Sequence, residues 1–314
     1  MHNHDHDEKD GLSRRHALEC MIWAGTGVVW TMAGGIPVAT GLLGQAQAAT
    51  PAFSFLQISD SHVGFDKPAN PNALGTLKEA IAKVNGMAVK PAFMLHTGDI
   101  THLSKPGEFD NADQVIGEAK LITHYVPGEH DVIDADRGKA YLDRYGKGSK
   151  GAGWYSFDDH GVHFIGLVNV VDLKAGGLGN LGADQIAWLE ADLKDRSDST
   201  PIVVFAHIPL WTVYAQWGWG TEDSERALQM LKRFGSVTVL NGHIHQVIQK
   251  VEGNLTFHTA LSTAFPQPAP GSAPSPGPML VPAEQLRMKL GIASVSVVEG
   301  KQALALVDST LAGS

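Results

Sequence analysis

Metal-ligating side chains follow five apolar stretches of this chain, at the points where buried strands would end. These points read Asp60-Ser61-His62, Gly98-Asp99, Gly128-Glu129-His130-Asp131, Ala206-His207 and Gly242-His243-Ile244-His245. Loops beyond the carboxyl ends of strands are where α/β sheets build their sites, and a glycine there lets the backbone approach closely. Five such ends in one chain are hard to obtain by chance. We therefore expect a sheet fold whose strand ends converge on one site.

His243 and His245 follow the apolar run at residues 237–240. Taken alone, a His-x-His pair is more often two structural histidines than a metal site. In extended backbone, alternate side chains point the same way, so both imidazoles are expected to face one site. The other four strand ends favour metal binding over the structural alternative.

Strands and helices are predicted to alternate over most of the chain. Predicted strands cover residues 53–58, 91–95, 121–126, 154–157, 162–168, 202–205 and 237–240, and predicted helices cover 74–84, 108–119, 183–193 and 224–234. Two hairpins, around residues 252–253 and 299–300, are expected to close the chain, with a Pro-rich surface loop at 266–282 between them. Alternation followed by hairpins indicates an α/β sandwich with mixed sheets.

The composition limits the possible partners. The formal charge of −9 argues against a basic nucleic-acid-binding surface. It allows a small phosphorylated substrate, because bound metal ions supply positive charge locally. The single cysteine, Cys20, lies in a segment that we expect to be removed. Any metal must then be held by His, Asp, Glu, Asn or backbone oxygen.

An export signal is predicted at the amino terminus. Arg14 and Arg15 precede an apolar stretch at residues 21–43, and Ala46-Gln47-Ala48 offers small residues at the spacing that a signal peptidase accepts. This segment resembles a twin-arginine (Tat) signal, although Ala17 and Glu19 stand where Phe and Lys are common. A transmembrane anchor is the alternative, but the proline and glycines of the stretch favour cleavage.

We expect residues 1–48 to be removed after transport by the Tat export machinery. Residues 49–314 would then form a single domain in the periplasm or outside the cell, with no stable membrane anchor. Because residues 1–48 carry five acidic and three basic side chains, the mature charge would be −7.

The five strand-end blocks, in this order, resemble the signature of the calcineurin-like metallophosphoesterase family, which reads D-x-H, G-D, G-N-H-D, H and G-H-x-H. The resemblance extends from residue 53 to residue 245. It implies a four-layer αββα sandwich of two mixed sheets and a hydrolase of phosphate esters, either monoesters or diesters. It also implies two metal ions, bridged by one carboxylate, whose bound hydroxide attacks phosphorus in line.

The resemblance also assigns roles to individual residues. It implies that the first metal is held by Asp60, His62 and His245. Asp99 would bridge the two metals, and the second metal would be held by His207 and His243. His130 would meet the phosphoryl group and protonate the leaving oxygen, with Asp131 as its orienting partner. Imidazole and carboxylate ligands without sulfur suit divalent or trivalent Mn, Fe, Zn or Ni, and spacing does not select among these metals.

Glu129 departs from the family pattern, which has Asn at this position. A carboxylate is a better ligand for a hard cation than an amide oxygen, so Glu129 is expected to bind the second metal directly. Its charge would make the bridging hydroxide more basic and would weaken attraction to a phosphate dianion. The alternatives are that Glu129 points away, or that the second site is weak or empty.

Other residues near these blocks are candidates for substrate contact. His102, three residues after Asp99, could contact a phosphate, support a ligand or serve a structural hydrogen bond. Trp211 and Tyr214 lie in the aromatic-rich loop after His207, where they could stack a ring, meet lipid or cap the core.

Two classes of function remain open from the sequence. The first is an exported, metal-dependent hydrolase of phosphate esters. The second is a non-catalytic or mononuclear metal-binding envelope protein with the same fold, in which Glu129 disables the second site.

Overall fold

The computed structural model describes residues 30–33, 36–39, 53–297 and 304–312. The chain forms two compact units, Met1–Thr50 and Pro51–Ser314. In the first unit, β1 (Trp30–Ala33) pairs antiparallel with β2 (Ile36–Ala39). The rest of the expected export signal lies outside the described residues.

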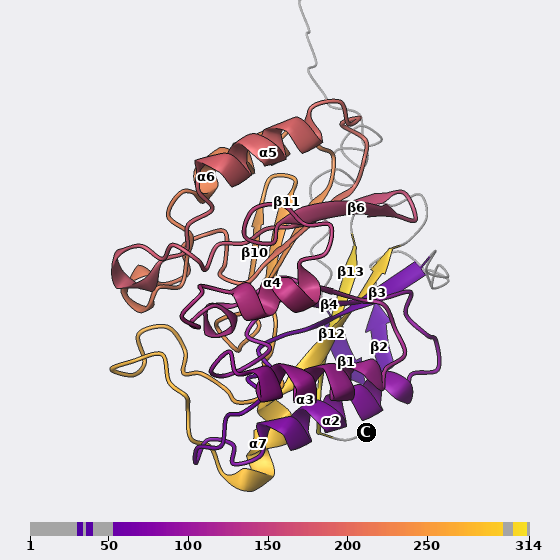
Figure 1. Ribbon diagram of the computed structural model, residues 1–314. Helices are drawn as coiled ribbons and strands as arrows, with labels where there is room; N and C mark the ends of the chain where they lie inside the picture. Colours follow the sequence, from indigo (N-terminus) through magenta and orange to yellow (C-terminus); the bar gives the residue numbers. More distant parts are fainter. Residues whose placement is uncertain (1–29, 34–35, 40–52, 298–303, 313–314) are drawn as a thin grey trace, which may run out of the picture. The chain divides into compact units, whose positions relative to one another are not determined.

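The second unit contains two mixed β-sheets (Figure 1). The larger has the order β10-β11-β9-β8-β7-β6, with bounds Gln249–Glu252, Leu255–Thr259, Val237–Asn241, Ile202–Ala206, Val162–Gly166 and Tyr155–Asp159. The smaller has the order β13-β12-β3-β4-β5, with bounds Ala305–Thr310, Gly291–Val297, Phe53–Ile58, Met94–His96 and Thr123–Tyr125. The inner strands β11, β9, β8 and β7 are parallel, as are β3, β4 and β5, whereas β6, β10, β12 and β13 pair antiparallel.

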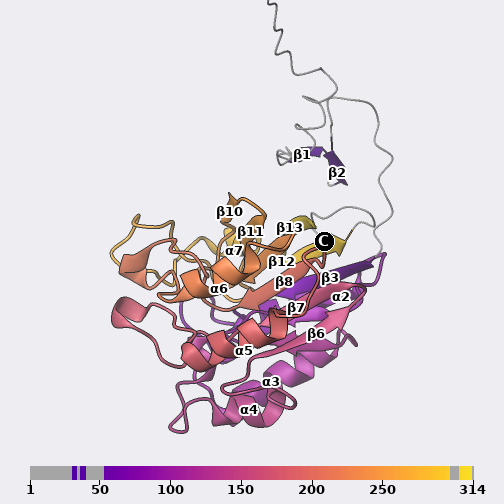
Figure 2. The ribbon, with the colours of Figure 1, turned by 90° about the horizontal axis from the view of Figure 1, so that it is seen from above.

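Helices cover the outer face of each sheet (Figures 1 and 2). α5 (Ala183–Leu193) and α6 (Ser224–Leu231) pack on the larger sheet. α2 (Ala73–Asn85), α3 (Pro106–Gly117), α4 (Lys139–Tyr145) and α7 (Ala283–Lys289) pack on the smaller sheet. This arrangement confirms the four-layer αββα sandwich.

The alternation of side chains along β3 shows why two sheets form. Phe53 and Phe55 pack between the sheets, where the ring of Phe55 meets that of Phe164 edge-on at 5.3 Å. Leu56 and Ile58 point the other way and pack beneath the helices. Since successive side chains of a strand face opposite sides, a strand that is apolar on both faces requires cover on both.

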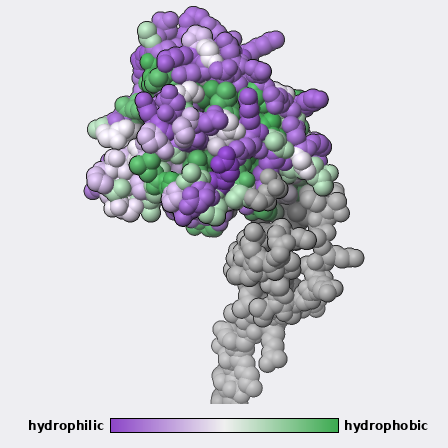
Figure 3. All heavy atoms as spheres, turned by 90° about the horizontal axis from the view of Figure 1, so that it is seen from below, coloured by the Kyte–Doolittle hydropathy of each residue, from purple (hydrophilic) through white to green (hydrophobic). Residues whose placement is uncertain are grey.

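The exposed side of α2 and α7 is mainly hydrophilic (Figure 3). Arg287 of α7 donates two hydrogen bonds to Glu79 of α2, at 2.5 and 2.7 Å. No helix within the described ranges has the length and apolar character needed to cross a membrane.

The observed elements differ from the predicted ones in places. β4 and β5 have only three residues each. Residues 266–282, where a loop is predicted, form neither helix nor strand. The helices α4 and α7 were not predicted, because each buries a single apolar side chain, Tyr141 and Leu286 respectively, and so has no periodic apolar stripe.

Candidate metal centre

Five loops at the carboxyl ends of strands bring the expected metal ligands together. Asp60 and His62 follow β3, Asp99 follows β4, Glu129 lies in the 3-10 helix η1 (Glu129–Asp131) after β5, His207 follows β8, and His243 and His245 follow β9. Within each sheet these strands are parallel, so their carboxyl ends lie at one edge.

A first group consists of Asp60, His62 and His245, which are at most 2% exposed. The Nε2 atom of His245 lies 3.2 Å from Asp60 Oδ1 and 3.3 Å from His62 Nε2. All three offer ligand atoms within 4.8 Å of one another. This spacing allows one cation to be held by all three side chains.

A second group consists of Glu129, His207 and His243. Glu129 Oε2 lies 2.9 Å from His207 Nε2, and Glu129 Oε1 lies 3.0 Å from His243 Nδ1. Although the first pair is close, neither Glu129 Oε2 nor His207 Nε2 has a hydrogen-bond partner of acceptable geometry, and both are buried. Two buried, unpartnered acceptors side by side are what a bound cation would join.

Asp99 lies between the two groups. Its Oδ2 atom is 3.4 Å from Nε2 of His62 in the first group and 3.4 Å from Nε2 of His207 in the second. The other oxygen, Oδ1, accepts a hydrogen bond of 2.9 Å from the backbone N–H of His130. One carboxylate is therefore in reach of both candidate cation positions.

Backbone carbonyl groups orient two of the imidazoles. His207 Nδ1 donates a hydrogen bond of 2.7 Å to the carbonyl oxygen of Thr97, and His245 Nδ1 donates one of 2.6 Å to that of Phe265. Each ring therefore carries its hydrogen on Nδ1 and presents the lone pair of Nε2 to the centre. Such contacts behind ligating histidines are typical of metal sites.

The electrostatics of the site also favour cations. Burial alone would lower the pKa of His207, but the carboxylates of Asp99 and Glu129 raise it well above its ordinary value. Burial would raise the pKa of Asp60, yet the imidazole of His245 lowers it to about 2. Buried carboxylates that draw positive charge onto their neighbours provide the environment that a metal ion needs, so the residues present fit metal binding.

Most of these ligands have a left-handed backbone conformation. The φ angles are 53° at Asp60, 39° at His62, 51° at Asp99, 70° at His243 and 52° at His245. Residues other than glycine rarely adopt such angles, which cluster at functional sites. The extended-backbone argument for His243 and His245 is therefore wrong: the chain turns at both, and the two imidazoles join different groups.

Glycines allow the loops to approach one another. A Cβ atom on Gly128 would lie 2.0 Å from Asp99 Oδ1, and one on Gly242 would lie 2.6 Å from Asp60 Oδ2. Both distances are far below van der Waals contact. The positions of these ligands therefore require glycine, which has no side chain, at residues 128 and 242.

Asp131 has different contacts from those expected. Its buried carboxylate accepts hydrogen bonds from the backbone N–H groups of Ile100, Thr101 and Gly128, and from the Thr101 hydroxyl. Burial, followed by the charge of Asp99, raises the pKa of Asp131 to about 6 against the effect of these bonds. All four acceptor positions of the carboxylate bind groups of the neighbouring loops. The prediction that Asp131 orients the imidazole of His130 is therefore wrong.

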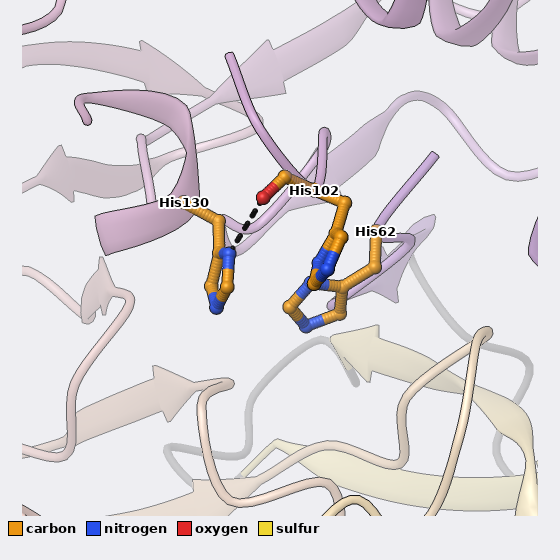
Figure 4. Close-up of side chains that lie close together, drawn as sticks. All are labelled: His62, His102 and His130. Carbon is orange, nitrogen blue, oxygen red and sulfur yellow. Dashed lines mark hydrogen bonds between the residues drawn. The ribbon is translucent and has the colours of Figure 1, made fainter. Parts of the chain in front are cut away.

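His102 supplies that orienting contact instead. Its carbonyl oxygen accepts a hydrogen bond of 2.7 Å from His130 Nδ1 (Figure 4). Its ring stacks on that of His130, with centroids 4.9 Å apart and planes inclined by 18°, and also lies near His62 and Phe65. Ligand atoms of His62, His102 and His130 also lie within 4.8 Å of one another. Because the carbonyl oxygen of His102 binds His130 Nδ1 and the two rings stack, we assign His102 to the support of His130.

The two aromatic candidates for substrate contact lie in different surroundings. Trp211 packs on Phe257, with ring centroids 5.0 Å apart, beside the core under α5 and α6. This position agrees with the alternative that Trp211 caps the core. The hydroxyl of Tyr214 donates a hydrogen bond of 2.6 Å to Gln216 Oε1, and its ring lies beside Gly271 of the Pro-rich loop. A role for Tyr214 in substrate contact stays a prediction.

Phe265 is a site residue that sequence reasoning missed. Its ring lies 4.8 Å from that of His62 and 4.6 Å from that of His245, and its carbonyl oxygen holds His245. It stands 20 residues beyond His245, just before the Pro-rich loop, outside every motif. An aromatic residue at the start of such a loop was the only available signal.

Other proteins resemble this chain in sequence and in fold. Residues 53–247 match the family described as Calcineurin-like phosphoesterase. The chain is 28% identical over 194 residues to glycerophosphodiester phosphodiesterase GpdQ of Enterobacter lignolyticus, covering 60% of this chain and 69% of that protein. It is 24% identical over 220 residues to 3',5'-cyclic-nucleotide phosphodiesterase alr5338 of Nostoc, covering 68% and 79%.

A solved structure supports the fold. A dimetal phosphatase from Danio rerio superposes with a TM-score of 0.63 at 14% identity, covering 83% of this chain and 97% of that one. The chain therefore belongs to the calcineurin-like phosphoesterase family, a metal-dependent family, and is a hydrolase that acts on phosphate esters.

Proposed function

We propose that the protein hydrolyses phosphate esters, diesters among them, with two metal ions held side by side. The position of Asp99 carries this proposal, because one oxygen lies 3.4 Å from an imidazole of each ligand group. Asp60, His62 and His245 would hold the first ion, and the group of Glu129, His207 and His243 would hold the second. The names of both relatives, as phosphodiesterases, support diesters as substrates.

Bound metal ions would supply Lewis acidity at the phosphoryl oxygens and lower the pKa of a water molecule. Asp99 Oδ2 would be shared by both ions, while its Oδ1 holds the backbone of His130. His130 would protonate the leaving oxygen from Nε2, since its Nδ1–H is held by the carbonyl oxygen of His102. Burial would lower the pKa of His130, but Asp99 and then Glu129 raise it above its ordinary value, which suits a proton donor.

Metal analysis combined with hydrolysis tests the dinuclear proposal. We expect the active protein to contain Mn, Fe, Zn or Ni at two ions per chain, and to hydrolyse bis-p-nitrophenyl phosphate until chelation removes them. Asp99→Asn should lower both the metal content and kcat/KM, the latter by about 100-fold or more. Asp184→Asn, an exposed change of the same kind on α5, is the control. An active wild-type protein with one ion per chain would contradict the proposal.

We further propose export by the Tat machinery, with cleavage after Ala48 and a periplasmic or extracellular location. Arg14 and Arg15, the apolar stretch at 21–43 and the small residues at 46–48 support this. Replacement of both arginines by lysine should retain the full-length chain in the cytoplasm. Equal export of both forms, seen by cell fractionation, would contradict it.

A further inference from the structure

We infer that Glu129 makes this centre selective for phosphoesters with one negative charge, that is diesters, over monoesters with two. The inference rests on the proposed dinuclear centre. It concerns how the charge of one side chain sets the class of anion that the centre accepts.

Glu129 places its whole carboxylate inside the second ligand group. One oxygen lies 2.9 Å from His207 Nε2 and the other lies 3.0 Å from His243 Nδ1. The backbone on either side is anchored, because the N–H of Gly128 donates to Asp131 Oδ2 and the N–H of His130 donates to Asp99 Oδ1. The side chain is 23% exposed, so part of Glu129 faces solvent, although its Oε2 atom is buried.

The charge balance follows from the ligands. Asp60, Asp99 and Glu129 contribute three negative charges, and the four imidazoles are neutral when they bind metal. With two divalent ions, these side chains leave one net positive charge, which the hydroxide nucleophile would cancel. A diester anion then adds one negative charge to the centre, whereas a monoester dianion adds two. Excess charge in a site with little water is costly.

Nearby side chains do not alter this balance. In the part of the chain that the structure describes, the ion-pair partners of the three carboxylates are all histidines. Lys105, in the loop after Asp99, pairs with Glu108 at 3.8 Å.

The test compares anion binding and turnover in variants that separate charge from shape. Glu129→Gln removes the charge and keeps the length, Glu129→Asp keeps the charge, and Glu190→Gln makes the same change on the exposed face of α5. Binding of inorganic phosphate and of dimethyl phosphate to the metal-loaded proteins is measured by calorimetry at about pH 8, where inorganic phosphate is mainly a dianion. Metal content and kcat/KM for p-nitrophenyl phosphate and bis-p-nitrophenyl phosphate are measured in parallel.

We expect Glu129→Gln to strengthen phosphate binding relative to dimethyl phosphate binding by about tenfold or more. The ratio of diester to monoester kcat/KM should fall by a similar factor, and Glu129→Asp and Glu190→Gln should leave both ratios near the wild-type values. Unchanged ratios in a Glu129→Gln protein that retains both ions would overturn the inference.

If the Glu129→Gln protein loses a metal ion, the same measurements are made on Glu129→Asn, whose shorter amide offers the same neutral ligand. Loss from both variants would also overturn the inference, because Glu129 would then retain the metal rather than select the anion. If the wild-type protein hydrolyses no ester with any metal, the proposed function fails, while the anion-binding ratios still decide the role of Glu129.

Discussion

The Oδ1 atom of Asp131 accepts two hydrogen bonds from Thr101, one of 2.8 Å from the amide and one of 2.9 Å from the hydroxyl. Its other oxygen accepts bonds of 3.0 Å from the backbone N–H groups of Ile100 and Gly128. Since Thr101 follows β4 and Asp131 follows β5, this buried side chain joins the loops that carry Asp99 and Glu129.

We expect Asp131→Asn to lower the free energy of unfolding by about 1–3 kcal/mol, because an amide nitrogen would replace one acceptor and face backbone donors. Metal content should fall as well, since Asp99 and Glu129 would lose their fixed separation. Urea unfolding and elemental analysis test this, with the exposed Asp195→Asn as the control. Wild-type stability in the Asp131 variant would contradict the proposed role as a loop clamp.

Gly128→Ala should disrupt the centre while leaving the sheets folded. Its new methyl group would lie 2.0 Å from Asp99 Oδ1 and 2.3 Å from the Asp99 backbone nitrogen, so one loop must move. Displacement of a reacting group by about 1 Å can cost roughly 100-fold in rate. Gly107→Ala in α3 is the control, because a Cβ atom there would meet no other atom within 4 Å and its φ is not left-handed. Full activity of Gly128→Ala would show that the loops can move apart without displacing Asp99 from its position in the centre.

His102→Phe and His102→Ala separate ring stacking from substrate contact. The phenyl ring preserves the stack on His130 and the nearby Phe65, so we expect kcat and KM close to the wild-type values. Alanine removes the stack, worth about 0.5–1.5 kcal/mol, and kcat should fall roughly tenfold as His130 loses its position. A large rise in KM for His102→Phe would instead indicate direct contact between His102 and the phosphate.

Removal of metal should destabilise the protein. Asp60, Asp99 and Glu129 crowd around a few histidines, and bound cations offset their repulsion. A ligand that binds only the folded state adds about 2.7 kcal/mol at 100 times its Kd. We therefore expect chelation to lower Tm by several degrees and Mn²⁺ to restore it, as followed by circular dichroism. A Tm that stays unchanged after chelation has removed the metal would contradict metal binding at this site.

A pH-dependent contribution to stability is expected far from the metals. The buried imidazole of His163 lies 2.9 Å from Asp158 Oδ1 and 2.7 Å from Asp192 Oδ2. Burial alone would raise the pKa of Asp192, but hydrogen bonds from His163 and Ser156 lower it. A carboxyl group with a lowered pKa stabilises the fold above its unfolded pKa, about 4, and loses this effect as the pH falls through the folded value.

Asp192→Asn should therefore lower the free energy of unfolding by about 1–2 kcal/mol near pH 7. The deficit relative to wild type should shrink below about pH 4. Urea unfolding at several pH values measures this deficit, with the exposed Asp195→Asn, just beyond α5, as the control. A deficit that stays constant into strong acid would show that the charge of Asp192 is unimportant.

Local patterns predicted the fold where they were strong. The strand 53–58 and the helix 183–193 have the predicted limits because apolar residues repeat there with a clear period. Short helices such as α4 and α7 depend on tertiary contacts, which a sequence window does not contain.

The gathering of the ligands was predictable from the family resemblance, but their support was not. Phe265 reaches His62 and His245 only because the loop after β11 folds back beside β3. The contact of His102 with His130 joins residues 28 apart through a backbone oxygen, which no side-chain pattern encodes. The same holds for Asp131, whose partners are mostly backbone N–H groups.

Left-handed backbone at Asp60, His62, Asp99, His243 and His245 also restricts how this protein can change. Aspartate, asparagine, histidine and glycine tolerate such angles, whereas branched aliphatic residues resist them. Mutations that remove a ligand thus tend to distort a loop as well. Lineages that abandon catalysis but keep the scaffold are therefore expected to retain polar residues or glycine at these five turns.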